Sequence, residues 1–224
     1  MIWDWAYAIK IFPELLNGLG VTIIVTLISS SFGLVGGLIA GVISTMRVRV
    51  LSALANTYIV VFRNTPFLVQ LYLIYFALPE FGIVLSAQVS GVLGLGLFIG
   101  AYMAEVFRAG IDSVPVEQWE ACKAINLSKF HTWTRIVLPQ AIPPVIPMLG
   151  NYANLAFKLS AYVAVIGTVE LLGTALRLGE QSYRYVEPFT LVGVLYLVVS
   201  VAVTVLLRQL EKRISRHRPQ MAMV

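Results

Sequence analysis

A run of 32 residues without a single charged side chain, from 15 to 46, constrains the fold of this chain more than any other feature. About 20 apolar residues in a helix are enough to cross the hydrocarbon core of a bilayer. The chain as a whole is 58% hydrophobic and only 12% charged, whereas soluble domains average about 25% charged residues. A soluble core could not bury this much apolar surface. We therefore predict an integral membrane protein whose first span covers residues 15–46.

Four further apolar stretches predict four more membrane helices. Arg63 interrupts the first of them. Residues 51–62 are expected to lie near the inner membrane–water interface and to precede the span. Residues 66–78 are expected to form the core of this second span. Thr65 suits its N-cap and Pro66 its first helical position. The other spans are predicted at residues 83–104, 136–157 and 188–207, which gives an all-α integral membrane protein of one domain, residues 1–224, with five transmembrane helices.

The distribution of basic residues predicts the orientation of the chain. Eleven of the 16 Lys and Arg residues fall in three segments that five spans place on one side of the membrane. Cytoplasmic loops are enriched in Lys and Arg, so we expect the N-terminus outside and the C-terminus, with its basic tail 208–224, in the cytoplasm. The net charge of +5 then reflects a basic cytoplasmic face and not a nucleic-acid partner.

The polar segment 112–135, between the third and fourth spans, predicts two short cytoplasmic helices that meet at a tight bend. Asn126 readily takes the left-handed conformation that ends a helix, and Ser128 can cap the next one. The first helix is expected to present a small, acid-tipped surface made of Glu120, Ala121 and Cys122. Periodicity and caps do not name a partner, so these residues alone leave an ordinary interfacial loop equally open.

Glu120-Ala121, Asn126 and Ile136-Val-Leu-Pro139 resemble the EAA loop of ABC importer permeases, whose pattern is EAA, three residues, G, nine residues, I-x-L-P. The spacing agrees at every step, while Cys122 replaces the second alanine and Asn126 the glycine. In that family the loop is a coupling helix that docks in a groove of the ATP-binding subunit. The resemblance implies this coupling role for Glu117, Glu120, Ala121, Cys122 and Asn126.

Three further segments resemble the polar amino acid branch of these permeases: Asn17-Gly-Leu-Gly-Val-Thr22, Arg63-Asn-Thr-Pro-Phe-Leu-Val-Gln70 and Ala104-Glu-Val-Phe-Arg-Ala-Gly-Ile111. Residues 119–127, 139–152 and 169–176 are most similar to the ectoine/hydroxyectoine-type permeases. The resemblance implies a multi-pass protein of the bacterial inner membrane that takes up a polar amino acid or a related zwitterion, such as ectoine, by alternating access. The implied partners are a dimer of ATP-binding subunits, a second permease subunit, identical or similar, an extracytoplasmic solute-binding protein and membrane lipid.

The chain shows no sign of hydrolysing ATP itself. A phosphate-binding loop needs a lysine after a glycine, and none of the five lysines follows one. We therefore expect no catalytic residue and no cofactor in this chain, with ATP and Mg bound by the partner subunit. One cysteine, Cys122, and two distant histidines give no basis for a disulfide or a multi-cysteine metal site.

The fourth span is the expected lining of the solute path. Prolines at 139, 143, 144 and 147 free backbone carbonyls, which is tolerated in a membrane beside water or within protein, although a simple kink would look the same. Lys158 is expected near the path, where it attracts a carboxylate, or else it snorkels or pairs with Glu170 or Glu180. The predicted path residues are Asn151, Tyr152, Lys158, Leu159 and Ser160.

Tyr152 and Leu159 also bear on the solute, because permeases of the basic amino acid type carry acids around these positions. Their replacement by uncharged residues favours a neutral zwitterion.

Glu105 and Arg108, one helical turn apart, predict a structural ion pair at the inner end of the third span. An ion-coupled secondary transporter or channel subunit is the alternative function, and a membrane-embedded enzyme is a third, although neither coupling carboxylates at mid-membrane nor a nucleophile–base pair is evident.

Overall fold

The computed structural model describes residues 3–46 and 48–216, and for residues 210–216 the backbone alone. Every element in these ranges is helical, which confirms the all-α prediction. The α-helices are α1 (Trp5–Ser44), α2 (Arg49–Asn64), α3 (Phe67–Tyr72), α4 (Ala87–Asp112), α5 (Val116–Ala124), α6 (Lys129–His131), α7 (Leu138–Leu159), α8 (Leu171–Ser182) and α9 (Val186–Arg216). Short π- or 3₁₀-helical segments lie at η1 (Leu73–Ala77), η2 (Leu78–Phe81), η3 (Thr132–Val137) and η4 (Ser160–Ile166).

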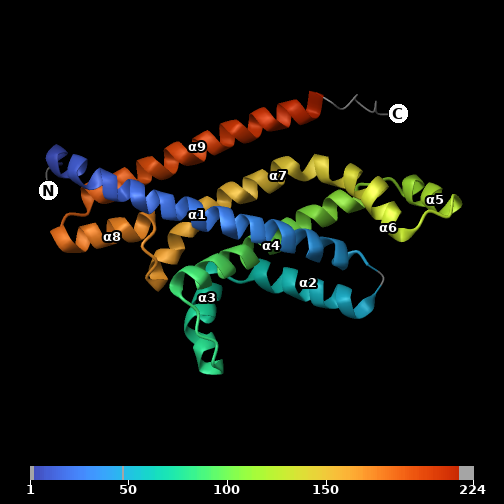
Figure 1. Ribbon diagram of the computed structural model, residues 1–224, viewed down its shortest axis with the longest axis horizontal. Coiled ribbons are helices and arrows are strands. Elements are labelled where there is room, and N and C mark those ends of the chain that lie inside the picture. The colour runs from blue at the N-terminus through green and yellow to red at the C-terminus, as the bar shows by residue number, and fades with distance from the viewer. Residues whose placement is uncertain (1–2, 47, 217–224) are drawn as a thin grey trace.

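Three helices in the described part are long and apolar enough to cross a membrane: α1, α4 and most of α9. The count rises to five when each of two bent pairs is taken as one span, which agrees with the prediction. Figure 1 shows α1, α4, α7 and α9 along the long axis, with α5 and α6 at one end and the N-terminal residues and α8 at the other. We call these the α5–α6 end and the α8 end.

The most extensive helix contact joins α1 and α4 through small residues. A Cβ on Gly37 would lie 2.8 Å from the carbonyl oxygen of Gly100, and one on Gly41 would lie 2.8 Å from that of Ala104. Gly33 faces Gly96 in the same way at 2.9 Å. Small residues allow helices in lipid to approach this closely. Because both series rise in steps of four, α1 and α4 run in the same direction.

The second span is broken between α2 and α3, which meet at a bend of 111° (Figure 1). The prediction that Thr65 caps this second helix is wrong: its hydroxyl donates 2.8 Å to the carbonyl of Val61, on the preceding helix. Pro66 itself stands in the N-cap position with extended backbone. Proline disfavours helical backbone at the residue before it, so Thr65 is extended as well (φ −113°, ψ 143°).

The first helix begins ten residues before the predicted span, at Trp5, because Asp4 caps it. The Asp4 carboxylate accepts hydrogen bonds from the backbone N–H groups of Ala6 and Tyr7 at 2.9 and 3.1 Å. The third span is also displaced, since Ser86 caps α4 and the helix continues to Asp112. These shifts lengthen the helices beyond the apolar runs that located them.

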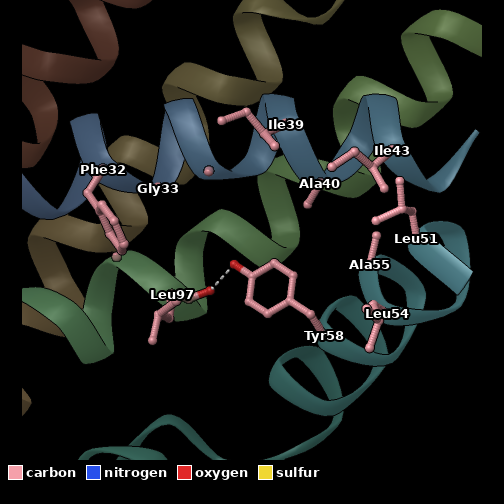
Figure 2. A pocket seen from close by; sticks show the side chains of 12 residues that line it. Phe32, Gly33, Ile39, Ala40, Ile43, Leu51, Leu54, Ala55, Tyr58 and Leu97 are labelled. Atoms are coloured by element: carbon pink, nitrogen blue, oxygen red, sulfur yellow. Dashed lines mark hydrogen bonds between the residues drawn. The ribbon is translucent and has the colours of Figure 1, made fainter.

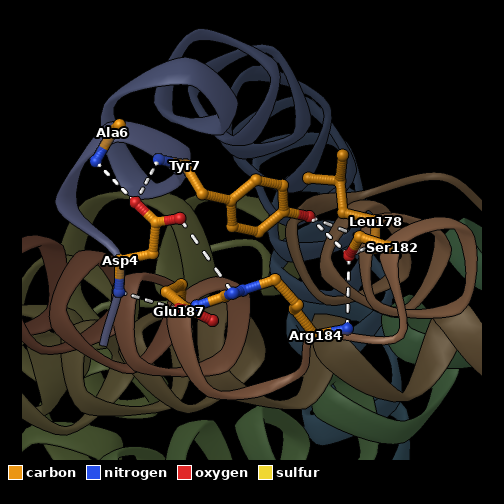
Figure 3. Close-up of polar contacts among 7 residues, drawn as sticks. All are labelled: Asp4, Ala6, Tyr7, Leu178, Ser182, Arg184 and Glu187. Carbon is orange, nitrogen blue, oxygen red and sulfur yellow. Dashed lines mark hydrogen bonds and ion pairs between the residues drawn. The ribbon is translucent and has the colours of Figure 1, made fainter. Parts of the chain in front are cut away.

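Polar contacts fix the N-terminal residues to the turn between α8 and α9 (Figure 3). The Tyr7 hydroxyl donates 2.7 Å to Ser182, and the Asp4 backbone N–H donates 3.0 Å to Glu187. Arg184 forms ion pairs with both Asp4 and Glu187. Its hydrogen bond to Glu187 raises the pKa of the Arg184 guanidinium above the usual value, so this link is charged at any physiological pH.

Candidate functional site

The α5–α6 element is held against the ends of α4 and α7 by a small apolar cluster. Ile111 and Val114 on one side pack with Val137 and Ala141 on the other. Trp119 of α5 meets Trp133 of η3 edge to face, with ring centroids 5.3 Å apart. This packing joins α5, through η3, to two of the long helices, α4 and α7.

The bend after α5 has the geometry that the sequence predicts. Asn126 adopts the left-handed conformation with φ +53°. The Leu127 N–H donates 2.9 Å to the Cys122 carbonyl, and the Asn126 N–H donates 3.0 Å to the Lys123 carbonyl. This pair of bonds is the Schellman ending of a helix. Ser128 caps the next helix by accepting from the His131 N–H at 3.4 Å, so both predictions are confirmed.

The surface of α5 differs in part from the predicted one. Glu117, Glu120 and Ala121 are exposed, but Cys122 is only 5% exposed. The expectation that Cys122 lies on the docking surface is wrong, because its side chain faces the side on which α5 packs. Two apolar residues that were not predicted to be exposed follow α5: Ile125, its C-cap residue, and Phe130 of α6 are both 72% exposed. They follow the last turn of α5, where helical periodicity no longer applies.

A groove of about 350 Å³ opens between α1, α2 and α4 (Figure 2). Its lining is apolar, and the Tyr58 hydroxyl within it is already used by a 2.7 Å bond to the Leu97 carbonyl. Gly36 also lies on this groove, where a Cβ would meet no other atom within 4 Å. A zwitterion would find no charged partner here, and none of the five predicted path residues lines the groove.

The predicted path residues fall on different faces around the end of α7. Tyr152 and Leu159, seven residues apart, are partly buried against the main apolar cluster. Asn151 and Lys158, also seven apart, are exposed on another face. Ser160 is fully buried, and its hydroxyl donates 2.7 Å to the Phe157 carbonyl. The ring of Tyr152 packs against that of Tyr102 on α4, with the ring centroids 5.4 Å apart.

The suggested pair between Lys158 and Glu170 is not formed. Glu170 is fully buried, and its carboxylate accepts from the hydroxyls of Thr22 at 2.9 Å and Tyr196 at 3.0 Å. It also accepts from the Gly173 N–H at 2.8 Å and so caps α8. Within the described residues Lys158 has no carboxylate within 4 Å, Glu180 included.

Glu170 joins α1, α8 and α9, a role that sequence reasoning missed. Gly18 makes the approach of α1 possible, because a Cβ there would lie 3.1 Å from the Glu170 carbonyl oxygen. The segment Asn17-Gly-Leu-Gly-Val-Thr22 therefore supplies both the gap and a hydrogen-bond donor. Glutamate is not among the residues preferred at a helix N-cap, so no local signal indicated this role.

The ion pair between Glu105 and Arg108 is confirmed. It has a third member, since Arg63 Nη1 lies 3.1 Å from the other oxygen of Glu105. Arg63 of α2 is therefore paired with an acid of α4. Its guanidinium also stands over the Tyr102 ring, 5.4 Å from the centroid. Among residues 3–46 and 48–209, no three His, Cys, Asp or Glu side chains lie close enough together to hold a metal ion.

Comparison with known proteins gives consistent matches over nearly the whole chain. Residues 33–216 match the family described as binding-protein-dependent transport system inner membrane component. The probable amino-acid ABC transporter permease protein y4tG of Sinorhizobium fredii is 38% identical over 205 residues, which cover 92% of this chain and 89% of that protein. The putative glutamine transport system permease protein GlnP of Rickettsia conorii is 34% identical, covering 92% of this chain and 97% of that protein.

Solved structures share the fold. A chain from the crystal structure of an amino acid ABC transporter with histidines superimposes with a TM-score of 0.88 at 34% identity, covering 95% of this chain and 100% of that one. A chain of the inward-facing MetNI methionine ABC transporter superimposes with a TM-score of 0.73 at 22% identity, covering 92% of this chain and 97% of that one. The helical arrangement is therefore that of a transporter's membrane component.

Proposed function

The chain belongs to the family of binding-protein-dependent transport system inner membrane components, and from this premise we propose that it carries a polar amino acid or a related zwitterion. It is a multi-pass permease subunit of an ABC importer for amino acids, and it is not itself an ATPase. An ATP-binding subunit and a solute-binding protein are its partners by virtue of that family. This membership removes the ion-coupled transporter and the membrane enzyme as alternatives.

The proposed contact with the ATP-binding subunits is the exposed surface of α5. Glu117 and Glu120 provide its charged part, Ala121 is a small exposed residue beside them, and Ile125 and Phe130 are exposed apolar residues that follow. Apolar groups beside a few charges are typical of a docking surface. Cys122 and Asn126 support this surface without forming part of it. Cys122 is buried on the inner side of α5, and Asn126 forms the bend that ends the helix.

This assignment sets the proposed orientation. ATP is hydrolysed in the cytoplasm, so the α5–α6 end faces the cytoplasm and the α8 end faces outward. The basic residues of the segment 112–135 lie at the cytoplasmic end, as the positive-inside rule requires. Because α1 and α9 both run from the α8 end toward the α5–α6 end (Figure 1), the N-terminus is outside and the tail 208–224 is cytoplasmic.

The proposed solute follows from the relatives and from Tyr152 and Leu159. The named relatives include putative glutamine permeases, and the two residues add no charge to the α7 face that they share. An unpaired charged solute side chain would lose several kcal/mol of hydration there, so a zwitterion, glutamine-like or ectoine-like, fits better than a cationic amino acid.

The proposed mechanism is alternating access driven from the α5–α6 end, with ATP and Mg held by the partner. Closure of two ATPase subunits moves α5, and the cluster of Ile111, Val114, Val137 and Ala141 carries the motion into α4 and α7. Five spans are few to enclose a gated path, so two permease subunits, identical or similar, stand side by side in lipid. Apolar residues that are exposed on α9, such as Leu197 and Val201, can pack against lipid or against the second permease subunit.

Reconstitution with the candidate ATPase and solute-binding protein tests this function. The observation that carries it is the exposed α5 surface on a helix anchored to two spans. Glu120→Arg is expected to abolish co-purification of the ATPase subunit and hydrolysis stimulated by loaded binding protein. Glu180→Arg makes the same change on an exposed residue of α8 and is expected to retain the ATPase subunit. Equal retention by both variants would show that α5 is not the coupling surface.

A further inference from the structure

Three charged side chains meet where α2 ends against α4. Arg63 precedes the last residue of α2, and Glu105 and Arg108 lie one turn apart on α4. Arg63 Nη1 lies 3.1 Å from one Glu105 oxygen, while Arg108 Nη2 bonds the other. At 1.5 Å of rise per residue, Glu105 lies roughly 27 Å along α4 from its first residue, in the half of this candidate span nearer the α5–α6 end.

These charges are not enclosed. The side chains of Arg63, Glu105 and Arg108 are 37%, 30% and 41% exposed. Charged groups within membrane spans are costly against lipid, and they face the bundle interior or a water-filled cavity. The open side of this cluster is therefore expected to face water or the second permease subunit, and not lipid.

Aromatic contacts connect the cluster to the expected path residue Tyr152. The Arg63 guanidinium stands over the Tyr102 ring at 5.4 Å, and the Tyr102 hydroxyl donates 3.3 Å to the Arg63 carbonyl. The opposite neighbour of Tyr102 is Tyr152, with ring centroids 5.4 Å apart. Contacts through Tyr102 thus connect the charged groups of α2 and α4 to Tyr152 of α7.

The charge of the cluster indicates what it binds. Two guanidinium groups share one carboxylate, which leaves one net positive charge. Each guanidinium has five N–H donors in a planar fork that suits a carboxylate, and Glu105 engages only one nitrogen of each in the contacts above. A carboxylate is the group that every amino acid and related zwitterion carries.

We propose that Arg63, Glu105 and Arg108 form a carboxylate-binding site for the transported solute, with Tyr102 and Tyr152 as its aromatic wall. The inference rests on the proposed function and adds the site at which the permease itself holds the solute. Glu105 orients the two guanidinium groups and limits their positive charge, so that the solute is held and then released.

Two substitutions that change the charge of the cluster in opposite directions distinguish a solute-binding site from a purely structural ion pair. Arg63→Gln lowers the cluster charge to zero, whereas Glu105→Gln raises it to two positive charges. If the cluster only ties α2 to α4, both changes break the same contact and act alike. If it binds a carboxylate, Arg63→Gln weakens binding and Glu105→Gln does not.

The experiment measures equilibrium binding of labelled L-glutamine and of labelled ectoine to the permease–ATPase complex without the binding protein, beside uptake by the complete importer. For the probe that is imported, Arg63→Gln is expected to weaken binding at least about tenfold, as for a lost charge-assisted hydrogen bond. Arg63→Lys should recover part of that loss, and Glu105→Gln should bind as tightly as the parent or tighter. Arg177→Gln, which breaks the exposed pair with Glu14 on α1, is the control and should change nothing.

Equal weakening by Arg63→Gln and Glu105→Gln would overturn the site, and so would unchanged binding in Arg63→Gln. Uptake without any probe binding to the parent complex would also overturn it, while leaving the proposed function intact. Absence of uptake of both probes by the parent importer would instead count against the proposed solute class. Thermal unfolding of each variant shows whether a loss of binding follows from a loss of fold.

Discussion

The two ends of the helix bundle are built on opposite principles (Figure 1). At the α8 end, polar groups are turned inward and satisfied by one another: the buried Glu170 carboxylate accepts from α1, α8 and α9. At the α5–α6 end, Glu120, Ile125 and Phe130 are exposed, and the apolar cluster beneath them anchors the element. One end holds the fold together, and the other presents a surface to a partner. Substitutions at the first should therefore cost stability, and those at the second should cost assembly.

Glu170→Ala is expected to have the largest effect. It leaves the buried hydroxyls of Thr22 and Tyr196 and the Gly173 N–H without their acceptor, which should lower the free energy of unfolding by roughly 3 kcal/mol or more. Thermal unfolding in detergent measures the loss. Glu180→Ala on the same helix is exposed and should stay within about 0.5 kcal/mol of the parent. Similar midpoints for the two variants would remove the contrast between the ends.

Ile125→Ser should have an intermediate effect that appears in assembly and not in stability. The side chain is 72% exposed, so its removal leaves the fold intact, but affinity for the ATPase subunit should fall about tenfold, as for a moderate interface residue. Titration of the purified permease with the ATPase subunit measures this. Ile83→Ser, a 50% exposed isoleucine just before α4 at the opposite end, should leave the affinity unchanged. A lower thermal midpoint in Ile125→Ser would contradict the assignment.

Substitutions of Asn126 should have the smallest effect and a defined sign. Asn126→Ala places a residue that disfavours φ +53° at the end of α5 and should cost about 1 kcal/mol. Asn126→Gly removes the steric penalty of the left-handed conformation and should be neutral or slightly stabilising. Hydrogen exchange at the amides of α5 measures both. Equal exchange in the two variants would show that the Schellman bend does not limit the stability of this element.

Local chemistry allowed several features to be predicted from the sequence. The left-handed Asn126, the Ser128 cap and the Glu105–Arg108 pair each depend on residues within three positions of one another. Short sequence spacing brings such groups together in any helix, so no tertiary information was needed.

The failures concern the direction in which a side chain points. Cys122 was placed on the docking surface and is buried, and Glu170 was offered as a partner for Lys158 but instead joins three helices. Thr65 was assigned to the wrong helix end, because the bend at Pro66 reverses which helix its hydroxyl reaches. Each error follows from a rotation or a bend that a pattern along one helix does not specify.

The sequence by itself determined that the chain is a helical membrane protein, where its apolar spans lie, and that an EAA-like bend connects two of them, because hydropathy and cap chemistry act along the chain. The tertiary structure alone decided that Arg63 joins Glu105, 42 positions away, and that Glu170 is enclosed by Thr22 and Tyr196. A helix that is apolar on every side, such as α1, carries no signal for its rotation about its own axis. Packing of small residues against α4 selects that rotation, and the polar contacts follow from it.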